Sequence, residues 1–166
     1  MAHFFHINID VNIDPPPTVG TNLSMNTGPH NLCTYGFNIP VIVANTPDSG
    51  APQPKSIMVI AHFDTGASVT CIDEKIVREL ELVPVEVGIM QTAQGSATAK
   101  KYLVNISFPN TGLRDYTLNV SDSNLPYNGS ATDMGPQNYG VLLGRDIMAN
   151  WNIVWNGPTS TVLVSD

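Results

Sequence analysis

The sequence is poor in charged residues, in cysteine and in long apolar runs, and each shortage excludes a class of protein. Only 13% of the 166 residues are charged, and seven Lys and Arg against fourteen Asp and Glu give a net charge of −7. Because there is no basic run, we expect no nucleic-acid partner. No apolar stretch is long enough to span a bilayer, so we expect no membrane partner either.

Cysteine and histidine usage sets expectations for compartment and cofactors. Two cysteines, Cys33 and Cys71, are too few for a disulfide framework. The first six residues lack the basic-then-apolar layout of a secretory signal, so we expect a cytoplasmic protein. The scattered histidines form no ligand set with Cys, and the sequence therefore predicts no metal and no other cofactor.

Composition changes near residue 36 and divides the chain in two. Residues 1–36 are rich in Pro, Asn, Thr and Gly, which predicts a partly flexible N-terminal extension with one alternating strand over residues 6–13. Residues 37–166 hold several short apolar runs separated by turn residues, and a short amphipathic helix over residues 73–82. The expected fold is all-β, a partly closed barrel with one or two short helices.

Two hairpins are predicted within residues 37–166. Residues 85–93 and 99–108 flank a Gly-containing tip, and in the second run Tyr102, Val104, Ile106 and Phe108 share one face. A terminal hairpin covers residues 151–164, with Trp151 and Trp155 expected to pack within it and to form a candidate dimer interface. The polar residues 121–137 show no period and predict a long loop.

The most informative stretch is the apolar run 57–63, which ends in Asp64-Thr65-Gly66-Ala67-Ser68. β-Branched residues favour a buried strand, and Gly66 permits a sharp turn after it. A carboxylate at the end of an apolar strand is costly unless donors hold it, so Asp64 is a candidate for acid–base chemistry. A triplet of the form Asp-(Ser/Thr)-Gly occurs by chance in about one chain in fifteen of this length. The alternative is therefore an ordinary turn that closes a strand.

A second segment strengthens the functional interpretation. Residues 139–148 are again an apolar run, Val141-Leu142-Leu143, followed by Gly144, Arg145 and a short helical signal. Together the two segments resemble the retropepsin-like aspartic proteases, over about residues 37–164. In that family the Asp turn carries the catalytic Asp, and an apolar-apolar-Gly-Arg segment threads beneath it, here Leu142 to Asp146.

The resemblance implies an aspartic endopeptidase that hydrolyses extended polypeptides. We expect a single Asp-(Thr/Ser)-Gly turn in this chain, at residues 64–66, whereas water activation needs two carboxylates that share a proton. A homodimer is therefore implied, with Asp64 of each copy at the two-fold axis. By the same resemblance, Thr65 fixes the two turns relative to each other and Gly66 offers its carbonyl to substrate.

The resemblance also implies roles for residues around the turn. The hairpin tip would be the flap that closes over substrate, formed by Ala93, Gln94, Gly95 and Ser96. Independently of the resemblance, His62 lies two residues before Asp64 and shares its face of the strand, so it is a candidate to line a substrate pocket or to tune the Asp pair electrostatically. A partly buried histidine with its hydrogen bonds satisfied within the barrel wall is the commoner situation. Ser68 replaces an Asp of many retroviral members, which leaves Arg145 without its usual carboxylate. Asp73, Glu74 and Asp146 are all open as its partner, and a plain surface charge is the alternative.

Two other functions stay open on the sequence. A protein of this fold can keep the Asp turn and yet serve as a non-catalytic dimerisation or peptide-binding module. A monomer inhibited by residues 1–36 lying in its cleft is the third possibility. Replacement of Asp64 by Asn separates the enzyme from the module, because only the enzyme loses cleavage.

Overall fold

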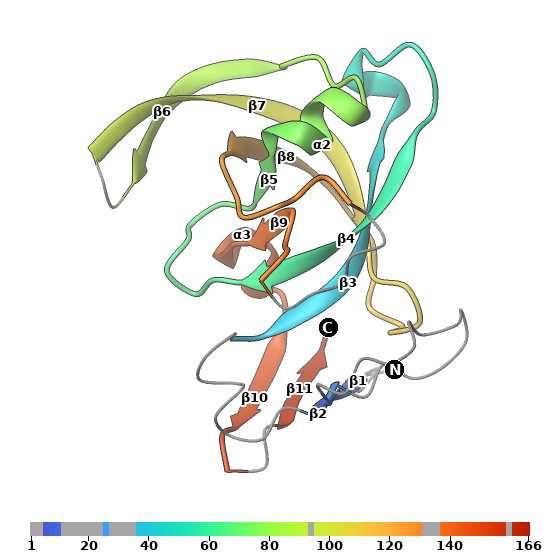
Figure 1. The fold of residues 1–166 in the computed structure, drawn as a ribbon, viewed down its shortest axis with the longest axis vertical. Coiled ribbons are helices and arrows are strands. Elements are labelled where there is room, and N and C mark those ends of the chain that lie inside the picture. Colours follow the sequence, from blue (N-terminus) through green and yellow to red (C-terminus); the bar gives the residue numbers. More distant parts are fainter. Residues whose placement is uncertain (1–4, 11–24, 27–35, 93–94, 131–136, 159–160) are drawn as a thin grey trace.

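The computed structural model describes residues 5–10, 25–26, 36–92, 95–130, 137–158 and 161–166 (Figure 1). The helical segments are η1 (Pro47–Ser49), α2 (Glu74–Glu79) and α3 (Arg145–Met148). The strands are β1 (Phe5–Asp10), β2 (Met25–Asn26), β3 (Asn38–Asn45), β4 (Ser56–Phe63), β5 (Cys71–Asp73), β6 (Glu86–Thr92), β7 (Gly95–Ser107), β8 (Tyr116–Ser123), β9 (Val141–Leu143), β10 (Asn152–Asn156) and β11 (Thr161–Ser165).

Six strands form a closed ring. They follow one another in the order β3–β4–β9–β5–β8–β7, and β3 also pairs with β7, so the sheet returns to its first strand. β6 pairs with β7 outside the ring. Figure 1 shows β6 and β7 as a curved two-stranded arm that arches away from the barrel. The predicted all-β barrel with short helices is confirmed. The barrel was expected to be partly closed, and the six-stranded ring is fully closed.

Alternating side chains of the ring fill one core. In β4, Ile57, Val59 and Ala61 face the core and are buried, as the period of two in a strand requires. On the other face Met58 is exposed, whereas Ile60 is also buried. Burying an aliphatic side chain of this size stabilises the fold by roughly 1.5–3 kcal/mol. The face predicted for β7 and the residue after it is confirmed as a core face, formed by Tyr102, Val104, Ile106 and Phe108.

A second sheet, of order β10–β11–β1–β2, lies at the end of the molecule opposite the arm (Figure 1). β1 is shorter than the strand expected over residues 6–13, and it pairs antiparallel with β11 in the register Phe5 to Val164. The tether expected between β1 and residue 36 lies outside the described residues, except for β2. One strand of the N-terminal extension therefore joins the C-terminal hairpin.

The two tryptophans of the terminal segment differ in burial. Trp151 is buried, with its ring against those of Phe63, Phe108 and Tyr116. Trp155 is 53% exposed, so the expectation that it packs within the hairpin is wrong. All five residues of β10 are exposed, and this strand lies at the edge of its sheet. The ring of Trp155 still meets that of Phe37 edge-on, with centroids 6.4 Å apart.

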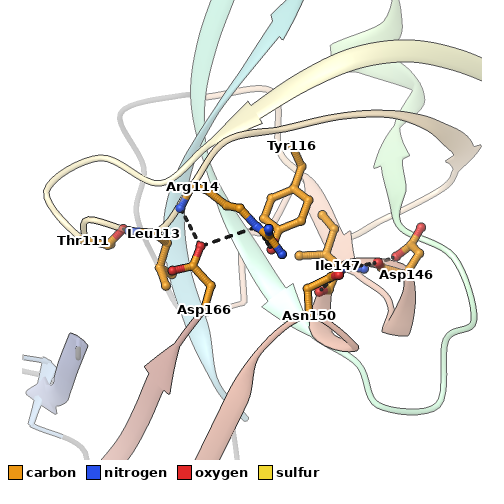
Figure 2. A network of polar contacts seen from close by, with 8 residues as sticks. All are labelled: Thr111, Leu113, Arg114, Tyr116, Asp146, Ile147, Asn150 and Asp166. Carbon is orange, nitrogen blue, oxygen red and sulfur yellow. Dashed lines mark hydrogen bonds and ion pairs between the residues drawn. The ribbon is translucent and has the colours of Figure 1, made fainter. Parts of the chain in front are cut away.

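The end of β11 is tied to the barrel by a polar contact. Asp166 accepts a hydrogen bond from the backbone N–H of Arg114 at 2.9 Å and forms an ion pair with its Nε at 3.6 Å. Figure 2 shows Arg114 between Asp166 and Tyr116, whose ring it also covers. The Asp166 side chain is only 8% exposed, so this contact fixes β11 against the segment that precedes β8.

The boundaries of two elements differ from those predicted from local sequence patterns. The expected helix over residues 73–82 is α2 alone, and Asp73 caps it by accepting from the N–H of Lys75. The expected loop begins later than residue 121, because β8 continues to Ser123. The last residues of β8 pair in parallel with β5. Because β5 is distant in sequence, a local pattern does not predict this pairing. None of the helices among the described residues has the length and apolar character needed to cross a membrane.

Candidate active site

Asp64 lies where β4 ends, and its turn is defined by hydrogen bonds. The backbone N–H of Asp64 donates to the carbonyl of Leu143 at 3.1 Å, and Ala67 N–H donates to the Asp64 carbonyl at 3.1 Å. Gly66 N–H donates to Asp64 Oδ1 at 2.7 Å. The side chain is half-buried, and Oδ2 has no hydrogen-bond partner among the described residues. The turn therefore orients a carboxylate and leaves one of its oxygens available.

β9 places the second sequence segment beside this turn. It inserts between β4 and β5, and its parallel register with β4 sets Leu142 opposite His62 and Leu143 opposite Phe63. Leu143 is fully buried, whereas Leu142 is half-buried. The two segments that were singled out in the sequence are thus adjacent strands of one sheet, although about eighty residues separate them.

Gly144 follows β9 at a point of very close backbone approach. A Cβ on this residue would lie 2.4 Å from the carbonyl carbon and 2.6 Å from the carbonyl oxygen of Val69. These are main-chain atoms, which cannot rotate out of the way. Only glycine allows the segment after β9 to pass this close to the segment that follows the Asp64 turn.

Thr70 and Asp146 join the two segments through side chains. Thr70 donates its backbone N–H to Asp146 Oδ2 at 2.8 Å and its hydroxyl to Asp146 Oδ1 at 2.7 Å. The Thr70 hydroxyl oxygen also accepts from the N–H of Gly144 at 3.1 Å. Asp146 in turn accepts from the N–H of Ile147 at the start of α3, which Figure 2 shows. Thr70 is fully buried, and no local pattern in the sequence indicates its importance.

Arg145 holds the Asp64 turn in place without binding any carboxylate. Its Nη1 donates to the carbonyls of Thr65 at 2.7 Å and Gly66 at 3.2 Å, and its Nη2 donates to Ser68 Oγ at 3.2 Å. Its backbone N–H donates to the Ala67 carbonyl. None of the three acids left open as its partner takes that place. Asp73 caps α2, Glu74 pairs with Arg78, and Asp146 binds Thr70.

His62 packs near the turn, between two residues that were not singled out. Its Nδ1 lies 2.7 Å from Asn38 Oδ1, and its ring stacks on Tyr139 with centroids 4.8 Å apart. An amide oxygen only accepts, so Nδ1 carries a proton in this contact. Burial lowers the pKa of His62, and the charge of Asp64 opposes that shift. Burial likewise raises the pKa of Tyr139, and Asp64 adds to it. Both rings therefore lie within electrostatic reach of Asp64.

The proposed flap is the tip of the β6–β7 arm. Its residues Gly95 and Ser96 are exposed, and Gly95 has φ 122°, a value that L side chains rarely adopt. Ala93 and Gln94 lie outside the described residues. Because β6 has no neighbour in the sheet other than β7, the arm extends beyond the barrel wall.

The expectation of a single Asp-(Thr/Ser)-Gly turn is wrong, because the chain has a second triplet of this form, Asp48-Ser49-Gly50. It lies in η1, where Ser49 is buried and Gly50 has φ 74°. The β3–β4 register pairs Ala44 with Ser56 and Asn38 with His62, so this triplet and Asp64 are at opposite ends of the hairpin. At about 3.3 Å per residue, the eight residues of β4 separate them by about 25 Å.

The described residues offer no group of three or more His, Cys, Asp and Glu side chains that could hold a metal ion. Cys71 is buried, and desolvation, assisted by Asp146, raises its thiol pKa to about 11. The polar and ring groups near the turn are the Asp64 carboxylate, the Arg145 guanidinium and the rings of His62 and Tyr139.

Comparisons with known proteins address the family. No curated protein matches the chain. Among solved structures, the Simian Foamy Virus (mac) protease is 17% identical, with TM-score 0.39 over 66% of this chain and 91% of that one. The EIAV protease in complex with the inhibitor HBY-793 is 13% identical, with TM-score 0.43 over 84% and 90%. A retropepsin-like aspartic protease from Rickettsia conorii is 13% identical, with TM-score 0.40 over 78% and 92%.

A family profile supplies the assignment. The profile described as "Aspartyl protease" matches residues 57–147, which is more than half of the chain. The match starts in β4 and ends in α3, so it contains both the Asp64 turn and the segment that Arg145 ties to it. The chain belongs to the aspartyl protease family.

Proposed function

We propose that the protein is an aspartic endopeptidase that acts as a homodimer on extended polypeptides. The observation that carries the proposal is Asp64, a half-buried carboxylate oriented by the N–H of Gly66 through one oxygen only. A buried strand, the β9 carbonyl of Leu143 and the Arg145 clamp all fix the turn that holds it. Preorganised placement of a reacting group is what catalysis requires.

Two such carboxylates complete the reaction. One ionised carboxylate takes a proton from water, and the other, protonated, donates to the carbonyl oxygen of the scissile peptide. Asp48 cannot be the second group, because it lies at the far end of the β3–β4 hairpin from Asp64. The second carboxylate therefore comes from Asp64 of another copy, and a two-fold axis brings the two turns together.

β10 supports the same proposal, because it offers a surface on which two copies can meet. Ile153, Val154 and Trp155 are 36%, 57% and 53% exposed on this edge strand. Consecutive apolar residues exposed on both faces of an edge strand mark an interaction or aggregation site. Pairing with a second copy would cover them. We assign the homodimer contact to the terminal hairpin on this ground.

The arm formed by β6 and β7 is the proposed flap. Its exposed tip residues Gly95 and Ser96 are small, so contacts with a substrate would be mainly to main-chain groups, as in β-strand addition. Closure of the tip over a bound peptide would exclude water from the two Asp64 carboxylates.

The test compares the wild type with Asp64→Asn and with Asp48→Asn on a mixed library of extended peptides. Wild type and Asp48→Asn should cleave, and Asp64→Asn should lose at least a thousandfold in kcat/KM. Sedimentation of the active sample should give twice the mass of one chain. Equal cleavage by Asp64→Asn and wild type, or activity confined to a monomer, would refute the proposal. If the wild type and both variants bind the peptides and none of them cleaves, the protein is the non-catalytic module instead.

A further inference from the structure

The guanidinium of Arg145 has donors that no described residue uses. Arginine carries five N–H groups, and the contacts to Thr65, Gly66 and Ser68 involve two on Nη1 and one on Nη2. Nε–H and one N–H of Nη2 are left without a partner within the described part of the chain. The side chain is exposed, so these two donors are accessible to a ligand.

The positive charge of Arg145 is also not paired. The other two arginines form ion pairs, Arg78 with Glu74 and Arg114 with Asp166. No carboxylate of the described residues pairs with Arg145, in a chain that has twice as many acidic as basic residues. The adjacent carboxylate of Asp146 is already held by Thr70 and by the N–H of Ile147. Arg145 is thus a cation beside the catalytic turn without a counter-ion.

Ser68 adds a third donor at the same place. Its Oγ accepts from Arg145 Nη2 at 3.2 Å, which leaves its own O–H free to donate, since no described residue accepts from it. A guanidinium edge and a hydroxyl within hydrogen-bond distance of each other form a suitable site for a carboxylate, which accepts several donors at once. An amide at the same place presents a single oxygen and no charge.

We infer that Arg145 and Ser68 form a subsite for an acidic side chain of the substrate. The inference rests on the proposed function and adds a substrate class to it: extended peptides with Glu or Asp at a position flanking the scissile bond. In a homodimer the subsite occurs twice, once on each side of the dyad. The preference should therefore appear at a flanking position on both sides of the cleaved bond.

The experiment scans Glu against Gln through the flanking positions of one cleaved peptide. For wild type, one position on each side should favour Glu by about five- to tenfold in kcat/KM at low salt, and the preference should fall as salt is raised. Ser68→Asp keeps the arginine but gives it an internal carboxylate, so the ratio of the Glu to the Gln peptide should fall to about one, both in kcat/KM and in binding affinity. Arg78→Met, which removes a cation of an exposed helix pair, should leave the preference unchanged.

Binding measurements separate failure of the subsite from failure of the proposed function. Calorimetry on Asp64→Asn should show the same Glu preference for the uncleaved peptides. A preference in binding without cleavage by wild type would refute the peptidase and support the subsite. Cleavage with equal use of Glu and Gln at every position would refute the subsite and leave the peptidase intact. Loss of the preference in Arg78→Met would also overturn the assignment.

Discussion

Thr70 binds Asp146 through both its backbone N–H and its hydroxyl, at 2.8 and 2.7 Å, across seventy-six positions of sequence. The same hydroxyl oxygen accepts from Gly144, so one buried side chain connects the chain after the Asp64 turn with the start of α3. The segment after the Asp64 turn is thus held by a contact that does not involve Asp64 itself.

Replacing Thr70 by Val keeps the shape of the side chain and removes the two hydrogen bonds of its hydroxyl, while the backbone N–H still reaches Asp146 Oδ2. Asp146 Oδ1 keeps only the N–H of Ile147, and the buried N–H of Gly144 loses its acceptor, so we expect a loss of about 3 kcal/mol in the free energy of unfolding. Urea denaturation measures it, with the exposed Thr117→Val as control, expected within about 0.5 kcal/mol of wild type. A loss as small as that of the control would show that the connection does not contribute to stability.

Gly144→Ala tests the close approach between the two segments. The added Cβ would collide with main-chain atoms of Val69, so we expect destabilisation by about 3 kcal/mol or more, and displacement of the Asp64 turn with loss of activity. Gly157→Ala is the matched control, because the nearest atom to its Cβ would be Trp155 Nε1 at 3.9 Å. Thermal melting and peptide cleavage of the two variants give the comparison. A fully stable Gly144→Ala protein would contradict the register of β9.

His62 should make stability depend on pH. Burial lowers its pKa below the 6.5 of an exposed histidine, so below pH 6.5 the unfolded chain binds a proton that the folded chain does not. The free energy of unfolding should therefore rise with pH through the window just below 6.5 and decline as pH falls through it. His62→Gln should show a shallower slope in urea titrations between pH 5 and 7. The other histidines are common to both proteins, so parallel curves would show that His62 does not cause the effect.

Cys71 should be chemically inert in the folded protein. Its pKa of about 11 keeps the thiol protonated at pH 8, and the side chain is buried. In a Cys33→Ser background, which removes the other thiol, iodoacetamide should label Cys71 at least a hundredfold more slowly in buffer than in urea. Similar rates in the two conditions would mean that the β5 region opens readily.

The sequence predicted those parts of the site that depend on neighbours along the chain. An apolar run, a turn-forming glycine and a capping carboxylate indicated β4, the Asp64 turn and the start of α2 at Asp73, because strand period, backbone freedom and helix capping are local effects. The family resemblance then joined the Asp64 turn to residues 142–146, and β9 accounts for that proximity physically.

Contacts between remote segments were not predictable in this way. Ring closure depends on β3 pairing with β7, and β8 is lengthened by β5, neither of which leaves a local pattern. From the sequence, a carboxylate is the expected partner of Arg145, but its guanidinium donates to two main-chain carbonyls and a hydroxyl. Main-chain acceptors exist at every residue, so no choice of residue type in the sequence could have indicated them.

The position of β9 has a consequence for synthesis. Its three residues insert between β4 and β5, which come some seventy to eighty positions earlier, and its Leu143 carbonyl holds the Asp64 amide. A nascent chain on the ribosome therefore lacks the strand that completes the wall until residues 141–143 have left the exit tunnel. The Asp64 turn, and with it the proposed peptidase site, therefore reaches its final geometry only late in synthesis.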